Sequence, residues 1–173
     1  NPASNVTPTR ATLVEAVADG WWYASLLADG RLAVNYYTDP DLMPGDVTRE
    51  PEVFRALIAE TLYIGEWISD AEFRLERTPR LVSAGTTWLA PAAGAGWAAV
   101  GDAAVAFDPL SSHGMTTALW TAISAAEAAH GMLAGSDDGL RRYVGQVASR
   151  VQNFLDSRTR VYGAEQRFSD RQF

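Results

Sequence analysis

Short apolar runs rich in Val, Leu, Trp and Tyr, separated by polar residues, occupy positions 12–38 of the chain. Such runs are typical of strands, and they predict three consecutive antiparallel strands over Thr12–Val17, Trp21–Leu27 and Arg31–Thr38. Asp-Gly dipeptides at positions 19–20 and 29–30 separate the strands, and such dipeptides favour hairpin turns. We therefore expect a three-stranded antiparallel sheet in this part of the chain.

Aromatic side chains occupy both faces of this expected sheet. Because successive strand residues point to opposite faces, Trp21 and Tyr23 share one face and Trp22 lies on the other. Tyr36 and Tyr37 on the third strand also point in opposite directions. Aromatic residues on a sheet face usually pack in a core, and contact with a ligand is the alternative for each of them.

The spacing of apolar residues changes to a helical period after residue 46. Thr48 can cap a helix whose first turn holds Glu50 and Pro51. An apolar stripe at helical spacing follows, made of Val53, Phe54, Leu57, Ile58, Thr61 and Leu62. Gly65 is expected to end or loosen this helix, and the charges of the AEFRLER stretch at 71–77 alternate with apolar residues, which indicates a solvated face.

The second half of the chain predicts two short strands and two long helices. We expect a strand over Arg80–Ala90, a loop over Pro91–Gly96 and a buried strand over Trp97–Gly101. Small residues dominate a helix over Ser112–Leu133, and an amphipathic helix follows from Leu140 to about Tyr162. The fold class expected from the whole pattern is α+β.

Composition excludes several kinds of function. The 173 residues contain 47% hydrophobic residues, which suits a folded domain with a core, and the net charge of −7 argues against a nucleic-acid or anionic-membrane partner. The chain has no Cys and no Lys, so it offers no thiolate, Schiff base or P-loop lysine, and the lack of Cys fits a cytoplasmic location. His113 and His130 have no carboxylate cluster around them, so no metal site is expected.

The segment GDAAVAFDPLSSHGMTTAL, residues 101–119, carries the chemistry that can be named. Gly101 lacks a Cβ, so a ligand can approach its backbone, and Asp102 can present two acceptor oxygens to vicinal hydroxyl groups. Asp108 and Pro109 break regular structure, and a serine at 111 or 112 can cap the helix that follows. The N–H groups at the start of that helix favour an anionic ligand.

This segment resembles the second FAD-binding motif of flavin-dependent monooxygenases and halogenases. In that family a strand ends in Gly-Asp, the carboxylate accepts hydrogen bonds from the ribityl hydroxyls of FAD, and a Pro-x-x-x-x-Gly turn starts a helix aimed at the flavin. The resemblance implies FAD as cofactor, and the candidate cofactor-binding residues are Gly101, Asp102, Pro109, Ser112, His113, Gly114 and Met115. It also makes the sheet the substrate side of the flavin, with Trp21, Trp22, Tyr23 and Tyr36 as candidate substrate contacts.

Two positions depart from the hydroxylase pattern. Many hydroxylases of the family have Gly where Ser111 stands and Asn where Thr116 stands. The Asp-Pro-x-x-Ser form is more similar to the tryptophan-halogenase branch and to relatives that assist the maturation of quinone-cofactor oxidases.

No Gly-x-Gly-x-x-Gly turn occurs in the chain, although a two-motif FAD protein needs one to hold the pyrophosphate. The nearest approach, Gly94-Ala95-Gly96, precedes an expected strand instead of opening a helix. The chain therefore resembles a C-terminal fragment of a larger flavoprotein whose dinucleotide-binding part is a missing partner. We expect residues 1–100 to form the substrate-side region and residues 101–173 to form the second FAD motif with its C-terminal helices, packed as one compact unit.

Three functions follow as hypotheses. The first is a portion of an FAD-dependent oxidoreductase, monooxygenase or halogenase-like, that acts on a small aromatic substrate. The second is a flavoprotein that modifies side chains of a partner oxidase during quinone-cofactor biogenesis. The third is a flavin-free α+β domain that binds a ligand or protein. The residues identify no catalytic group; His113 could move a proton near the flavin or simply face water.

Overall fold

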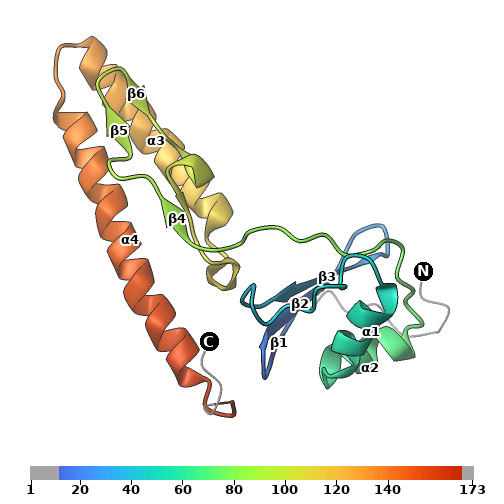
Figure 1. Ribbon diagram of the computed structural model, residues 1–173. Helices are drawn as coiled ribbons and strands as arrows, with labels where there is room; N and C mark the ends of the chain where they lie inside the picture. The colour runs from blue at the N-terminus through green and yellow to red at the C-terminus, as the bar shows by residue number, and fades with distance from the viewer. Residues whose placement is uncertain (1–11, 169–173) are drawn as a thin grey trace. The chain divides into compact units, whose positions relative to one another are not determined.

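The computed structural model describes residues 12–168, and within them the chain divides into two compact units. Residues 12–82 form the first, called here the sheet unit, and residues 83–166 form the second, called here the helical unit. The boundary thus lies between Val82 and Ser83, so the expected boundary at residue 100 falls inside the helical unit. Helices and small antiparallel sheets are mixed, as expected for an α+β fold (Figure 1).

The sheet unit is built on the expected three-stranded antiparallel sheet. Its strands are β1 (Thr12–Val17), β2 (Gly20–Leu26) and β3 (Leu32–Tyr37), in that spatial order. Trp22 pairs with Tyr36 on β3, so the register places these two aromatic residues on the same face. The prediction of this sheet is confirmed.

Two short helices cover the sheet where the sequence predicts one. They are α1 (Pro51–Ala59) and α2 (Tyr63–Asp70), and Gly65 lies inside α2 instead of ending a helix. The break comes from β1, because the Glu15 carboxylate accepts hydrogen bonds from the N–H groups of Leu62, Tyr63 and Ile64 and so caps a new helix. The cap expected from Thr48 is wrong, since Glu50 is the N-cap residue of α1 and makes no side-chain cap bond.

The first part of the helical unit contains much shorter strands than the sequence predicts. They pair as β4 (Thr87–Trp88) with β7 (Val105–Ala106) and as β5 (Ala93–Gly94) with β6 (Trp97–Ala98). The long strand expected over residues 80–90 and the loop expected over 91–96 are therefore wrong. Trp97 is exposed, although a buried strand was expected there. Its ring covers Gly94, where a Cβ would lie 2.7 Å from the Trp97 Nε1, and this contact explains the glycine in the hairpin.

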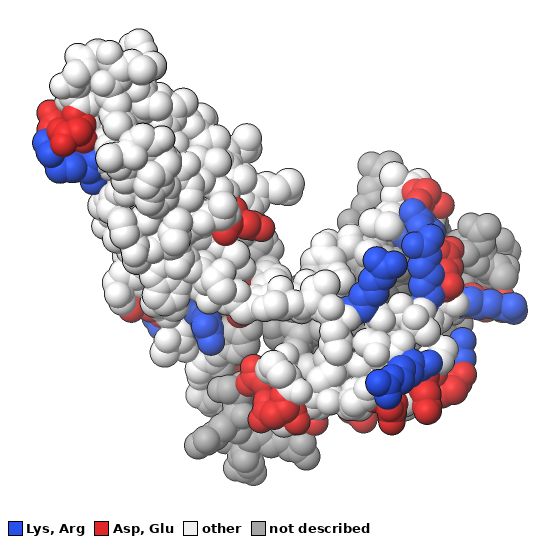
Figure 2. Space-filling model, turned by 45° about the horizontal axis from the view of Figure 1, so that its top comes forward, with Lys and Arg blue, Asp and Glu red and all other residues white. Residues whose placement is uncertain are grey.

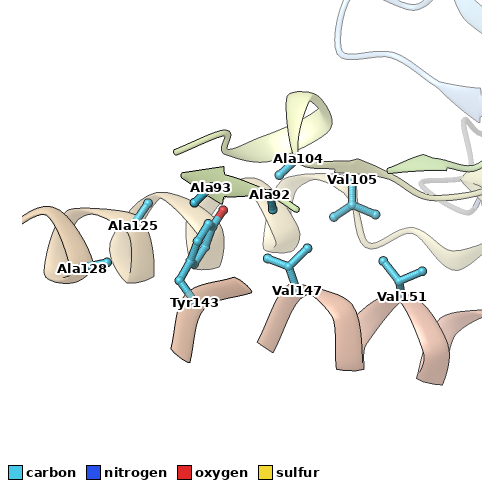
Figure 3. Close-up of a cluster of buried hydrophobic side chains, with 9 residues drawn as sticks. All are labelled: Ala92, Ala93, Ala104, Val105, Ala125, Ala128, Tyr143, Val147 and Val151. Atoms are coloured by element: carbon cyan, nitrogen blue, oxygen red, sulfur yellow. The ribbon is translucent and has the colours of Figure 1, made fainter. Parts of the chain in front are cut away.

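Two long helices complete the helical unit. They are α3 (Gly114–Leu133) and α4 (Asp138–Ala164), close to the predicted ranges. Figure 3 shows the core between them, where Tyr143, Val147 and Val151 of α4 point toward alanines of α3 and of the β5 region. Close approach is possible because Gly139 lies against Ala128, where a Cβ would come within 3.0 Å of the Ala128 Cα. Within residues 12–168, neither of these helices nor any other is long and apolar enough to cross a membrane.

Candidate functional site

Gly101 anchors the Gly-Asp segment on α3. It begins a short 3-10 helix, η1 (Gly101–Ala103), with a φ of +58°, a conformation that favours glycine. Its N–H donates to the Thr121 Oγ1 at 2.8 Å, and the Thr121 hydroxyl donates to the Thr117 carbonyl at 2.7 Å. A Cβ at Gly101 would make only ordinary contacts with Ala118, so the backbone conformation, not lack of space, requires glycine here. The segment follows an extended residue, Val100, but the strand expected over Trp97–Gly101 is reduced to β6 (Trp97–Ala98), which is exposed and not buried.

Asp102 is exposed at the first turn of η1. Among residues 12–168, nothing donates a hydrogen bond to its carboxylate and no cation pairs with it. A carboxylate that makes no hydrogen bond within the described residues has both oxygens available to a ligand.

The start of α3 lies next to this carboxylate segment. Gly101 packs on Ala118, and Gly114 begins the helix four residues earlier, which corresponds to about 6 Å along the axis. The first N–H groups of a helix have no partner within the helix, and here Gly114 and Met115 are both exposed. The Gly-Asp segment and the positive end of α3 are therefore brought together within the helical unit.

The turn before α3 does not use the serine cap that the sequence predicts. Pro109 begins a second 3-10 helix, η2 (Pro109–Ser111), which is followed by Ser112 in the left-handed region with a φ of +54°. His113 is the N-cap residue of α3 and is exposed, but its side chain forms no cap bond, so the serine cap predicted from the sequence is wrong. The His113 N–H instead donates to the Ser111 Oγ at 3.3 Å.

Asp108 fixes this turn to the far end of α4, a role that the sequence did not reveal. One carboxylate oxygen accepts from the Leu110 N–H at 2.9 Å and the other from the Tyr162 hydroxyl at 2.8 Å. Because Tyr162 lies 54 residues away, no local pattern connects the two. Asp108 thus positions the turn, while Asp102 stays accessible.

The candidate substrate residues divide between the two faces of the sheet in the sheet unit. Trp22 is 1% exposed and stacks on Tyr36, with ring centroids 4.5 Å apart. Phe54 of α1 lies against the same indole at 5.4 Å, so Trp22 and Tyr36 belong to the core. Burial also raises the pKa of the Tyr36 hydroxyl.

The opposite face carries Trp21 and Tyr23. Trp21 is only 8% exposed and its ring stacks on Tyr37 with centroids 4.0 Å apart, so it is buried like Trp22, whereas Tyr23 is half-buried. Val14, which pairs with Tyr23 on β1, is exposed. On this face, therefore, Tyr23 is the candidate substrate residue that keeps some exposure.

One face of α3 is apolar and exposed along its whole length. Met115, Leu119 and Ile123 succeed one another every four residues and are 85%, 68% and 62% exposed. Alanines at 122, 126 and 129 and Leu133 continue the same face, and all of them are exposed. Much of the visible surface of the α3–α4 hairpin carries no charged side chain (Figure 2). We call this set of residues the α3 apolar face.

Comparison with known proteins identifies one relative by sequence. No family model matches the chain, and no solved structure matches it. The chain is 28% identical over 162 residues to a protein from Marinomonas mediterranea that carries the provisional name FAD-dependent oxidoreductase LodB. The match covers 92% of this chain and 42% of that protein, so the chain spans less than half of the relative's length. This similarity relates the chain to an FAD-dependent oxidoreductase.

Proposed function

We propose that this chain is the substrate-side and C-terminal portion of an FAD-dependent oxidoreductase, and that residues 101–115 hold the flavin end of FAD. The observation that carries the proposal is the free Asp102 carboxylate beside the start of α3, held there by the bond from Gly101 to Thr121. The relative's name supports FAD as the cofactor. The bound flavin supplies the electron transfer, and the protein's contribution is to bind and orient it.

Each residue of the segment has a distinct part in this proposal. Asp102 accepts hydrogen bonds from ribityl hydroxyls, and Gly101 allows the cofactor to approach the backbone. The N–H groups of Gly114 and Met115 at the positive end of α3 would stabilise the negative charge that a flavin gathers on reduction. Pro109 and Ser112 shape the turn that leads to them. His113 is exposed, so it is a candidate for proton exchange with water instead of a ring contact.

The α3 apolar face supports a further part of the proposal, namely that a dinucleotide-binding part of the same flavoprotein covers it. The relative has more than half of its length outside the match, and this chain lacks a Gly-x-Gly-x-x-Gly turn for the pyrophosphate. Leaving Met115, Leu119 and Ile123 in water is unfavourable, and their contiguous apolar surface is typical of an interface.

The docking proposal can be tested with two polypeptides. The dinucleotide-binding part is co-expressed with this chain, and complex formation is measured by co-purification. We expect Leu119→Glu and Ile123→Glu to abolish the complex. Val161→Glu on α4, also at an exposed apolar position, is the matched control and should leave it intact. Equal loss with all three variants would contradict docking at this face.

For the reaction itself we propose monooxygenase or halogenase-like chemistry on an aromatic group. What supports an aromatic substrate is the half-buried Tyr23 beside the exposed Val14 on one face of the sheet, since aromatic side chains hold planar groups well. The substrate is a small phenol or indole, or a side chain of a partner oxidase. The reduced flavoprotein is mixed with oxygen and one candidate substrate at a time. The candidates are free indole or phenol, each with and without halide, and a peptide. Oxygenated or halogenated indole or phenol supports the first substrate, and a modified peptide supports the second.

The first measurement is whether the flavoprotein holds FAD. We expect flavin absorbance that co-elutes with the joined protein and FAD released on heat denaturation. A joined protein that is folded but colourless after incubation with FAD would favour a flavin-free binding domain.

A further inference from the structure

A groove runs between α3 and α4 away from the Gly-Asp segment. It has a volume of about 450 Å³ and is lined by Trp120, Arg142, Gly145, Gln146, Ser149 and Arg150. Trp120 is five residues after Met115, which places it about 140° around α3 from Met115. The groove is therefore a separate surface from the one proposed to dock the dinucleotide-binding part.

The two arginines of the groove form no close ion pair among the described residues, although Asp138, whose pKa is lowered mainly by Arg141, also interacts with the charge of Arg142. Within residues 12–168, no carboxylate lies within 4.0 Å of the guanidinium group of Arg142 or Arg150. The neighbouring Arg141, by contrast, pairs with Asp137 at 2.6 Å and with Asp138 at 2.8 Å. The groove is thus a local cationic site on a chain whose net charge is −7.

Trp120 orients one of these arginines. The Arg150 guanidinium carbon lies 4.0 Å from the centre of the Trp120 ring, a stacked arrangement that is favourable for a cation over an indole. Stacking on the ring leaves the N–H groups at the guanidinium edge available to an acceptor. Arg150 is therefore prepositioned, and holding it in place costs a ligand little side-chain entropy.

Gly145 lies between the arginines and keeps the floor of the groove low. A Cβ at this position would meet nothing within 4 Å, so no contact inside the structure requires glycine. Glycine in a helix interior costs about 1 kcal/mol relative to alanine. A molecule that binds close to the α4 backbone would require glycine at this position.

We propose that this groove binds an acidic polypeptide segment. Arg142 and Arg150 are eight residues apart on α4, which corresponds to about 12 Å along the axis. In an extended segment, carboxylates four residues apart are separated by about 13 Å. Such a segment matches both cations, with Gln146 and Ser149 facing its backbone. A single small anion suits the groove less well, because Arg150 is held on Trp120 and lies eight residues from Arg142 along α4.

The test uses the whole chain and a fluorescein-labelled octaglutamate peptide, with binding followed by fluorescence anisotropy at low salt. We expect binding despite the like net charge, a shift of the Trp120 indole N–H signal in NMR spectra, and weakening as salt is added. Arg142→Gln and Arg150→Gln should each weaken binding about threefold to fivefold. Gly145→Leu, whose Cβ would meet nothing within 4 Å, places a bulky side chain in the groove and should abolish binding.

Arg160→Gln is the matched control, because Arg160 is an exposed arginine of the same helix outside the groove. It should change the affinity less than twofold, within the range of long-range charge effects. Equal weakening by Arg160→Gln, or no binding of octaglutamate, would overturn the proposal. Citrate that shifts the Trp120 signal and displaces the peptide at equal carboxylate concentration would also overturn it, in favour of a small-anion site.

Discussion

Thr121→Val removes the hydroxyl that holds the Gly-Asp segment on α3, and its effect can be estimated from the structure. The side chain is fully buried, and its Oγ1 accepts from the Gly101 N–H at 2.8 Å. Valine has nearly the same shape, so little packing is lost, but the Gly101 N–H loses its acceptor. An orphaned buried donor costs about 1–3 kcal/mol, and because Gly101 is half-buried we expect about 1.5 kcal/mol.

The assay combines thermal unfolding with hydrogen exchange at a single amide. A loss of about 1.5 kcal/mol lowers the Tm by roughly 3–6 °C in a chain of this size. The Gly101 amide should exchange about tenfold faster, since that free energy is a factor of about ten in an opening equilibrium.

Thr117→Val is the matched control for this change. Thr117 is buried on the same side of α3, one turn earlier, and its hydroxyl makes no hydrogen bond within the described residues. We expect a change below about 0.5 kcal/mol and unaltered exchange at Gly101. If the two valine variants behave alike, the bond from Gly101 to Thr121 does not hold the segment and the account of the site is wrong.

Three further predictions concern the two units separately. Glu15→Ala should destabilise the sheet unit by about 1 kcal/mol in urea unfolding, because α2 loses its cap, and unchanged stability would contradict that role. Trp22→Leu should cost about 2–4 kcal/mol, while Trp88→Leu at an exposed position should be nearly neutral; equal effects would remove Trp22 from the core. Burial raises the pKa of Tyr36 and Tyr143 above 10.0 in the folded chain, so their stabilisation is complete below pH 10 and is lost as pH rises through the folded pKa. Replacing both tyrosines with Phe should flatten the alkaline limb of stability against pH, and an unchanged limb would show that other groups cause it.

The parts of the fold that follow local patterns were predictable from the sequence. Apolar runs rich in strand-forming residues and two Asp-Gly turns predicted β1 to β3, and residue patterns predicted α3 and α4 to within a few residues. The single helix predicted after residue 50 is two helices in the structure, because Glu15 of β1, far away in sequence, caps the start of α2. The strand predicted over residues 80–90 failed because only Thr87 and Trp88 find a pairing partner.

The candidate site shows the same division. The spacing of Gly101, Asp102 and Gly114 identified a segment that the structure does gather at the start of α3. The hydroxyl of Thr121 that holds it, twenty residues from Gly101, has no local signature. The sequence favoured Trp22 only slightly over Trp21 as a substrate contact, and the structure buries both, with Trp22 packed in the core beside Phe54 and Ile64.

The central claim is that Asp102 binds the ribityl chain of FAD, and the most direct test is the FAD affinity of Asp102→Asn in the protein joined to its dinucleotide-binding part. Glu127→Gln, which removes an exposed carboxylate elsewhere on α3, is the control. Losing hydrogen bonds to a charged acceptor costs about 2 kcal/mol, so we expect the Kd for FAD to rise about thirtyfold in Asp102→Asn and to stay within twofold of the parent in Glu127→Gln, with both proteins folded. An unchanged Kd in a folded Asp102→Asn protein would contradict the assignment of this segment to the flavin.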